Sequence, residues 1–86
     1  MMLAWIIMQT EPGMAAGVTR TVAQIAGVVQ ADLVAGYYDV IACARAGTVD
    51  ELGSLVDAIR AVQHVTRVLV CWRQEPEPAH PERIET

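Results

Sequence analysis

Two short segments are apolar at every position, and they limit what this chain can fold into more than any other feature. They span residues 3–8 and residues 40–44. Side chains along a strand point alternately to the two faces of a sheet, so a strand that is apolar throughout is covered on both faces. We therefore place both segments at the centre of a sheet. Residues 28–34 and 65–72 also predict strands, and the polar side chains on one face of each suit the edges.

The strand segments are separated by two stretches with the apolar spacing of amphipathic helices. The first helix is expected to open at Pro12, whose missing N–H costs nothing at that position, and to stop at Gly27. The second is expected to begin with a capping box. There the Thr48 hydroxyl accepts from the amide of Glu51, and the Glu51 carboxylate reaches back to the amide of Thr48. The predicted buried positions are Met14, Val18, Val22 and Ile25 in the first helix and Leu52, Leu55, Val56, Ile59 and Val62 in the second.

The resulting order, β-α-β-β-α-β, predicts a ferredoxin-like α+β domain over residues 1–73. We expect an antiparallel four-stranded sheet in the order 4-1-3-2, with both helices on one face. Residues 74–86 contain three prolines and four glutamates. This acidic, Pro-rich segment is expected to be a disordered tail, because it has little to bury.

Two helices can cover only one face of such a sheet, which leaves the second face apolar and uncovered. Strand spacing and rise give each face an area of about 400 Å². An exposed apolar patch of that size on a monomer indicates an interface. A second copy packed sheet to sheet about a two-fold axis is the simplest cover, so we predict a homodimer. Trp5, Ile7 and Trp72 are the candidate dimer-interface residues, with burial in the core as the alternative for the tryptophans.

Composition argues against several classes of function. The formal net charge is −4, and the chain has six arginines and no lysine. Direct nucleic-acid binding needs a clustered basic face, which is not found here. The apolar start is shorter than the roughly 20 residues of a membrane span and lacks signal-peptide features, so a cytoplasmic location is expected.

The cysteines and histidines give no sign of a metal site. Cys43 and Cys71 lie within apolar runs and predict buried free thiols in a reducing compartment. No CxxC spacing occurs, and no metal or cofactor is expected. His64 should end the second helix, and neither His64 nor His80 has a carboxylate or thiol partner at a spacing that suggests catalysis. Glu11 is expected to be an exposed, solvated charge.

The connection between the second and third strands is the strongest candidate for a binding site. It is Gly36-Tyr37-Tyr38-Asp39, predicted as the tight turn of a β-hairpin. A turn that only reverses the chain more often uses Asn-Gly or Asp-Gly. Asp39 could accept an α-amino group or hold the turn through an Asx-type bond, and Gly36 could serve the ligand or only the turn. The tyrosines could supply a stacking wall and a hydroxyl donor, or be buried at a subunit contact.

The ordered set of motifs resembles the C-terminal effector-binding (RAM) domain of the Lrp/AsnC, or feast/famine, transcriptional regulators. The motifs are Ala4-Trp5-Ile6-Ile7-Met8, Glu11-Pro12-Gly13, Gly27-Val28-Val29, Gly36-Tyr37-Tyr38-Asp39-Val40, Asp50-Glu51-Leu52 and Val65-Thr66-Arg67. The resemblance implies a dimeric α/β barrel, often a ring of four dimers, with amino acids bound where dimers meet.

By that resemblance, the G-x-x-D turn and part of the last strand form the effector site. Its candidate residues in this chain are Gly36, Tyr37, Tyr38, Asp39, Thr66, Val68 and Val70. Members often have threonines at the positions of Val68 and Val70, so these valines predict an apolar amino acid as the effector, or an empty site. The DNA-binding domain of full-length members has no counterpart in this sequence.

Three functions therefore compete. The first is an effector-binding and oligomerisation module for transcriptional regulation, acting on its own or by co-assembly with a full-length Lrp/AsnC-type regulator. The second is a structural assembly partner without a ligand. The third is a small monooxygenase-like or isomerase-like enzyme of the dimeric α/β-barrel fold. The predicted inward-facing positions carry no acid–base pair, so a non-enzyme is expected.

Overall fold

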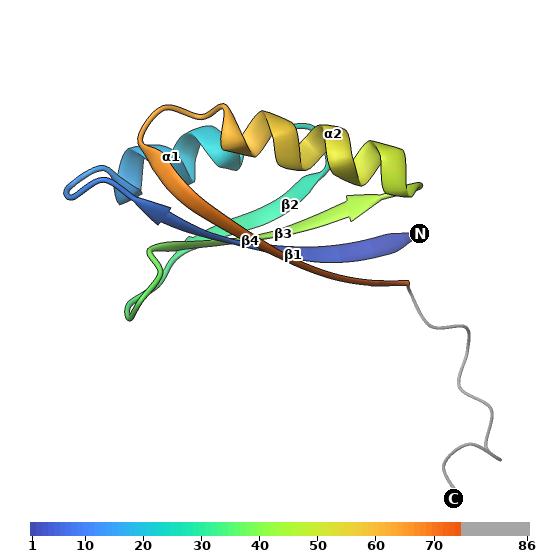
Figure 1. Cartoon of the computed structure of the whole chain (residues 1–86), viewed down its shortest axis with the longest axis horizontal. Helices are drawn as coiled ribbons and strands as arrows, with labels where there is room; N and C mark the ends of the chain where they lie inside the picture. The colour runs from blue at the N-terminus through green and yellow to red at the C-terminus, as the bar shows by residue number, and fades with distance from the viewer. Residues whose placement is uncertain (75–86) are drawn as a thin grey trace, which may run out of the picture.

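The predicted architecture is confirmed by a computed structural model that describes residues 1–74. A single four-stranded antiparallel sheet has the order β2-β3-β1-β4, and both helices lie on one side of it (Figure 1). This is the expected 4-1-3-2 order read from the other edge. The elements are β1 (Met2–Thr10), α1 (Ala15–Val22), β2 (Val28–Leu33), β3 (Val40–Ala46), α2 (Val49–Arg60) and β4 (Val65–Gln74). The last strand therefore extends one residue past the predicted domain boundary, and residues 75–86 of the predicted tail lie outside the described residues.

The core lies between the sheet and the helices, and it follows the alternation of β1 and β3. Every second residue of β1 from Met2 to Met8 is buried, as is every second residue of β3 from Val40 to Ala46. Of the predicted stripes, α1 buries Val18 and Val22 and α2 buries Leu52, Leu55, Val56 and Ile59. Met14, Ile25 and Val62 lie outside the two helices and are only partly buried. The fully buried large side chains are Ile6, Met8, Val22, Val40 and Ile59.

The first helix differs from the prediction at both ends. It begins at Ala15 rather than at Pro12, because Pro12 and Gly13 form a turn in which the Met14 amide donates to the Glu11 carbonyl over 3.1 Å. It ends at Val22, before Gly27. Gly27 instead adopts φ +96° in the turn that enters β2, and its carbonyl accepts from the Arg45 amide at 2.8 Å. The prediction missed the intervening turn, since Ile25 remains partly buried after the helix has ended.

The cap of the second helix is half as predicted. The amide of Glu51 donates to the Thr48 hydroxyl over 3.1 Å, which confirms Thr48 as the N-cap. The Glu51 carboxylate, however, accepts from the amide of Gly47 at 2.8 Å instead of from that of Thr48. The side chain thus reaches one residue further back and ties the end of β3 to the first turn of α2.

The face of the sheet away from the helices, called the open face below, carries a contiguous apolar band. Its side chains lie opposite each other across β3, β1 and β4, and none of them is fully buried. The band consists of Leu3, Trp5 and Ile7 from β1, Ile41 and Cys43 from β3, and Leu69 and Cys71 from β4. Arg73 lies at one end of it, with its guanidinium carbon 5.8 Å from the centre of the Trp5 ring.

Two of the predicted residue positions differ in the structure. Trp72 is in register with Ala4, so it lies on the helix side of the sheet beside α2, and it is 55% exposed. It therefore does not share a face with Trp5 and Ile7. The cysteines are not core thiols, because both flank Trp5 on the open face, where Cys43 is half-buried and Cys71 is exposed.

Candidate effector site at the end of the sheet

The segment between β2 and β3 is a six-residue loop, residues 34–39, and not the tight turn that was predicted. The loop closes where the Val34 amide donates to the Asp39 carbonyl over 2.9 Å. Gly36 has φ +128°, and a Cβ placed on it would meet no atom within 4 Å. A side chain at this position would be strained by the backbone but not by its surroundings. The glycine is therefore explained by the shape of the loop alone.

Asp39 fastens the loop to the end of β1. One carboxylate oxygen, Oδ2, accepts from the Thr10 amide at 2.8 Å and from the Thr10 hydroxyl at 3.4 Å. The Asp39 amide donates to the carbonyl of Met8 over 2.9 Å. A second tie comes from Gln9, whose Nε2 donates to the Tyr37 carbonyl over 2.7 Å. Among residues 1–74, the other carboxylate oxygen of Asp39 has no partner, so it remains able to accept from a ligand.

The two tyrosines take different positions. Tyr37 is 92% exposed, whereas Tyr38 is half-buried. The bonds that hold the loop at Tyr37 use its backbone carbonyl rather than its ring. An almost fully exposed aromatic ring on the loop that carries Asp39 is suited to contact with another molecule.

The last strand contributes less to this site than the sequence suggested. Val68 and Val70 are in register with Met8 and Ile6, so their side chains pack against the core on the helix side. Within one chain they do not face the loop. The predicted preference for an apolar effector depended on these two side chains and loses that support. Thr66 is exposed at the start of β4, where a register shift between Gln9 and Thr10 marks an irregularity in the pairing.

Sequence reasoning missed the partners from β1. Gln9 and Thr10 are the only polar residues of that strand, and a polar pair that ends an otherwise apolar strand was the available signal. It also missed the contact between the neighbouring turns. His64 Nδ1 lies 2.6 Å from Glu11 Oε1, and the Glu11 amide donates to the His64 carbonyl over 2.9 Å. His64 adopts φ +78°, so Glu11 is an exposed but paired charge, and His64 does have a carboxylate partner.

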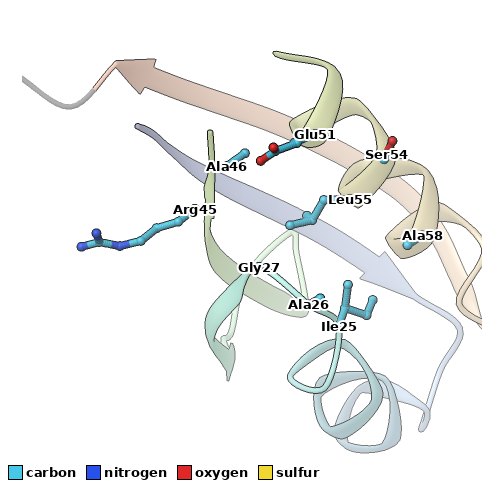
Figure 2. A pocket seen from close by; sticks show the side chains of 9 residues that line it. All are labelled: Ile25, Ala26, Gly27, Arg45, Ala46, Glu51, Ser54, Leu55 and Ala58. Carbon is cyan, nitrogen blue, oxygen red and sulfur yellow. The ribbon is translucent and has the colours of Figure 1, made fainter. Parts of the chain in front are cut away.

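A separate cavity of about 460 Å³ lies between the turn after α1 and helix α2 (Figure 2). Its wall is mainly apolar, with Ile25 and Leu55 pointing toward its interior, while the side chain of Arg45 extends away from the other lining residues. The Glu51 carboxylate at its rim is engaged with the Gly47 amide. This cavity lacks the convergent polar groups expected of a catalytic or polar-ligand site.

Within residues 1–74, no three side chains of His, Cys, Asp or Glu gather closely enough to hold a metal ion. No helix in this part of the chain has the length and apolar character needed to cross a membrane.

Comparison with known proteins gives matches in structure. TTHA0845 from Thermus thermophilus aligns with a TM-score of 0.83 and 22% identity, covering 92% of this chain and 100% of that one. FFRP-DM1 aligns with a TM-score of 0.79 and 24% identity, covering 86% of this chain and 100% of that one. E. coli AsnC aligns with a TM-score of 0.76 and 13% identity, covering 92% of this chain and 55% of AsnC. The chain has the RAM-domain fold of the Lrp/AsnC-type regulators. No protein-family model and no curated protein matches the chain.

The RAM-domain fold alone does not decide the function, because one arrangement of helices and strands supports several activities. The E. coli Tat proofreading chaperone NapD also aligns, with a TM-score of 0.71 and 15% identity over 92% of this chain and 83% of NapD. The function therefore has to be argued from the open face and the loop.

Proposed function

We propose that this chain is a regulatory module that binds a small metabolite, most simply an amino acid, and assembles through its open face as a homodimer. One observation carries the proposal. An uncovered apolar sheet face and an anchored polar loop occur together in one RAM-domain fold. The first feature supports assembly and the second supports ligand binding. Full-length regulators of the Lrp/AsnC type are candidate co-assembly partners, and a ring of dimers is the candidate higher assembly.

The case for a homodimer rests on what the open face would expose. Leu69 alone is 45% exposed, and the half-buried side chains of Leu3, Trp5 and Ile7 adjoin it. A face of about 400 Å² from strand geometry is smaller than the roughly 800 Å² that each partner buries in a standard interface. Contacts at its rim must therefore contribute, and the loop at residues 34–39 and the exposed edge strands supply candidates.

The case for a ligand rests on the loop. The loop presents the free carboxylate oxygen of Asp39 and the exposed ring of Tyr37 on a backbone that is already fixed. Such preorganisation lowers the free-energy cost of binding a ligand. A carboxylate that already accepts from the Thr10 amide keeps its position while its second oxygen receives an ammonium group. The proposal therefore includes Asp39 as the group that receives the α-amino group of the effector.

The test combines mass and thermal stability. Light scattering of the whole chain should give a multiple of the 9.3 kDa protomer. A thermal-shift screen of the twenty amino acids should then show stabilisation by at least one of them. A ligand at 100 times its dissociation constant adds about 2.7 kcal/mol to the free energy of unfolding. A monomeric mass would refute the assembly part, and no response at millimolar concentrations would favour a structural partner without a ligand.

A further inference from the structure

The end of the sheet that carries the loop has a second charged group, which belongs to β4. Arg67 is in register with Gln9, and Gln9 is the residue that holds the loop through the Tyr37 carbonyl. Gln9 and Arg67 thus stand on the adjacent strands β1 and β4, and Asp39, the loop residue just before β3, lies on the other side of β1. An anion, an amide and a cation lie side by side at one end of the sheet.

Strand alternation places the Gln9 and Arg67 side chains on the same side of the sheet. Gln9 follows the buried Met8, and Arg67 precedes Val68, which packs against the core. Since neighbouring side chains along a strand point to opposite faces, both leave the sheet on the open face, beyond the apolar band. Asp39 lies in the loop just before β3, and its carboxylate is held at the same end of the sheet by the Thr10 amide.

The charges on this row are available to a ligand. Among residues 1–74, no hydrogen bond or ion pair occupies the Arg67 guanidinium, and Oδ1 of Asp39 is also unoccupied. The Gln9 amide uses its nitrogen to hold the loop, which leaves its oxygen as a further acceptor. Neighbouring strands are about 4.8 Å apart, so the backbones that carry Asp39 and Arg67 are separated by about 10 Å. That gap lets the flexible arginine arm reach back over Gln9 with a small molecule between the two charges.

We propose that Arg67 is the specificity-determining residue of this site and binds the α-carboxylate of a zwitterionic amino acid. Asp39, with the Gln9 oxygen, receives the ammonium group of the same molecule. The guanidinium group offers two parallel N–H donors that match a carboxylate, and such charge-assisted pairs are roughly twice as strong as neutral hydrogen bonds. The inference rests on the proposed effector function. The inference goes beyond that function because it requires a free carboxylate on the ligand and assigns Arg67 to bind it.

The site as proposed discriminates by charge pattern more than by side chain. A ligand that has lost its carboxylate leaves Arg67 without its partner, and one that has lost its ammonium group leaves Asp39 without its own. The amino-acid side chain then points away from the row toward Tyr37, which is 92% exposed and imposes little shape. Selection among amino acids by their side chains then depends on the molecule that covers the Tyr37 ring.

The experiment compares an amino acid with its methyl ester, using whole-chain protein and isothermal titration at constant ionic strength. The amino acid is the one that gives the largest thermal shift with the wild-type chain. We expect the ester, which keeps the ammonium group, to bind about tenfold more weakly to the wild type. Arg67→Gln should weaken binding of the amino acid about tenfold while leaving binding of the ester unchanged. Arg20→Gln, an exposed arginine on α1, is the matched control and should change neither.

The outcomes separate this inference from the function on which it rests. If no amino acid binds the wild-type chain, the effector function itself fails. If the amino acid binds but Arg67→Gln leaves its affinity and its preference over the ester intact, the role of Arg67 is refuted and the effector function stands. Light scattering of Arg67→Gln shows whether assembly is intact. If assembly is lost, Arg67→Lys serves as the second variant. It keeps the charge without the bidentate fork and should bind the amino acid with intermediate affinity.

Discussion

Asp39 has two separable roles in this structure, and one pair of substitutions distinguishes them. Asp39→Ala removes the acceptor of the Thr10 amide, at 2.8 Å, and of its hydroxyl, at 3.4 Å, in a partly buried setting. A donor left without a partner costs about 1–3 kcal/mol, so we expect the free energy of unfolding to fall by about 2 kcal/mol. Asp39→Asn keeps an oxygen at the same place and loses only the charge, which should cost about 1 kcal/mol or less.

Urea denaturation measures both effects at one fixed protein concentration, because assembly makes stability depend on concentration. With a slope of about 1 kcal/mol/M for a small domain, the midpoint should drop by about 2 M for Asp39→Ala and by less than about 1 M for Asp39→Asn. Hydrogen exchange at the Thr10 amide should accelerate in the alanine variant only. Thr10→Val is the matched control, since it removes the longer hydroxyl contact and keeps the amide bond.

The ligand response should separate the two roles in the opposite way. Asp39→Asn keeps the loop in place but removes the charge that receives an ammonium group, so it should lose the thermal-shift response at near-normal stability. An alanine variant as stable as the wild type would refute the anchoring role. An asparagine variant with an unchanged ligand response would show that Asp39 only holds the loop.

Three further changes test the rest of the structure. Leu69→Glu on the open face should shift the mass toward the monomer in light scattering, whereas Val49→Glu, 64% exposed on α2, should not; an unchanged mass for Leu69→Glu would place the interface elsewhere. Gly27→Ala should lower the free energy of unfolding by about 1–3 kcal/mol in urea melts, because φ is +96° there and the new Cβ would lie 2.6 Å from a leucine methyl carbon. Gly53→Ala, in open space on α2, should instead raise it by up to about 1 kcal/mol, and a gain at both positions would contradict the packing described here. The exposed thiol of Cys71 should react with a thiol reagent in dilute, dissociated protein and be protected at high concentration, and equal rates at both would argue against burial of the open face.

The parts of this fold that depend on periodicity could be predicted from sequence. The unbroken apolar run of residues 3–8 placed β1 at the centre, and the helical stripe around Leu52 and Ile59 placed α2 over it, because both patterns are set by burial over several residues. The N-cap at Thr48 was also predictable, since it depends on a contact only three residues away.

The errors fell where a single long-range contact decides the structure. Trp72 was grouped with Trp5 and Ile7 although it lies on the other face, because alternation within β4 gives no absolute phase and the register with Ala4 sets it. The contacts of Asp39 with Thr10 and of His64 with Glu11 join residues 29 and 53 positions apart. The polar end of β1 marked Thr10 as unusual, but no local pattern pairs residues this far apart in the sequence. The position of the candidate site at residues 36–39 could thus be proposed from the sequence, while its β1 partners came only from the fold.

The hydrogen bonds that hold the loop at residues 34–39 determine which of its residues can be substituted during evolution. Its fastenings use the carbonyl of Tyr37, the amide of Asp39 and the carboxylate of Asp39, and none of them requires either tyrosine ring. Tyr37 could therefore be exchanged for many other residues with little loss of stability. Such a loop can acquire new contacts, and so new ligands or partners, while the sheet beneath it stays the same. The groups that hold the loop in place are the loop backbone and the Asp39 carboxylate, whereas the exposed side chain of Tyr37 can change without affecting them.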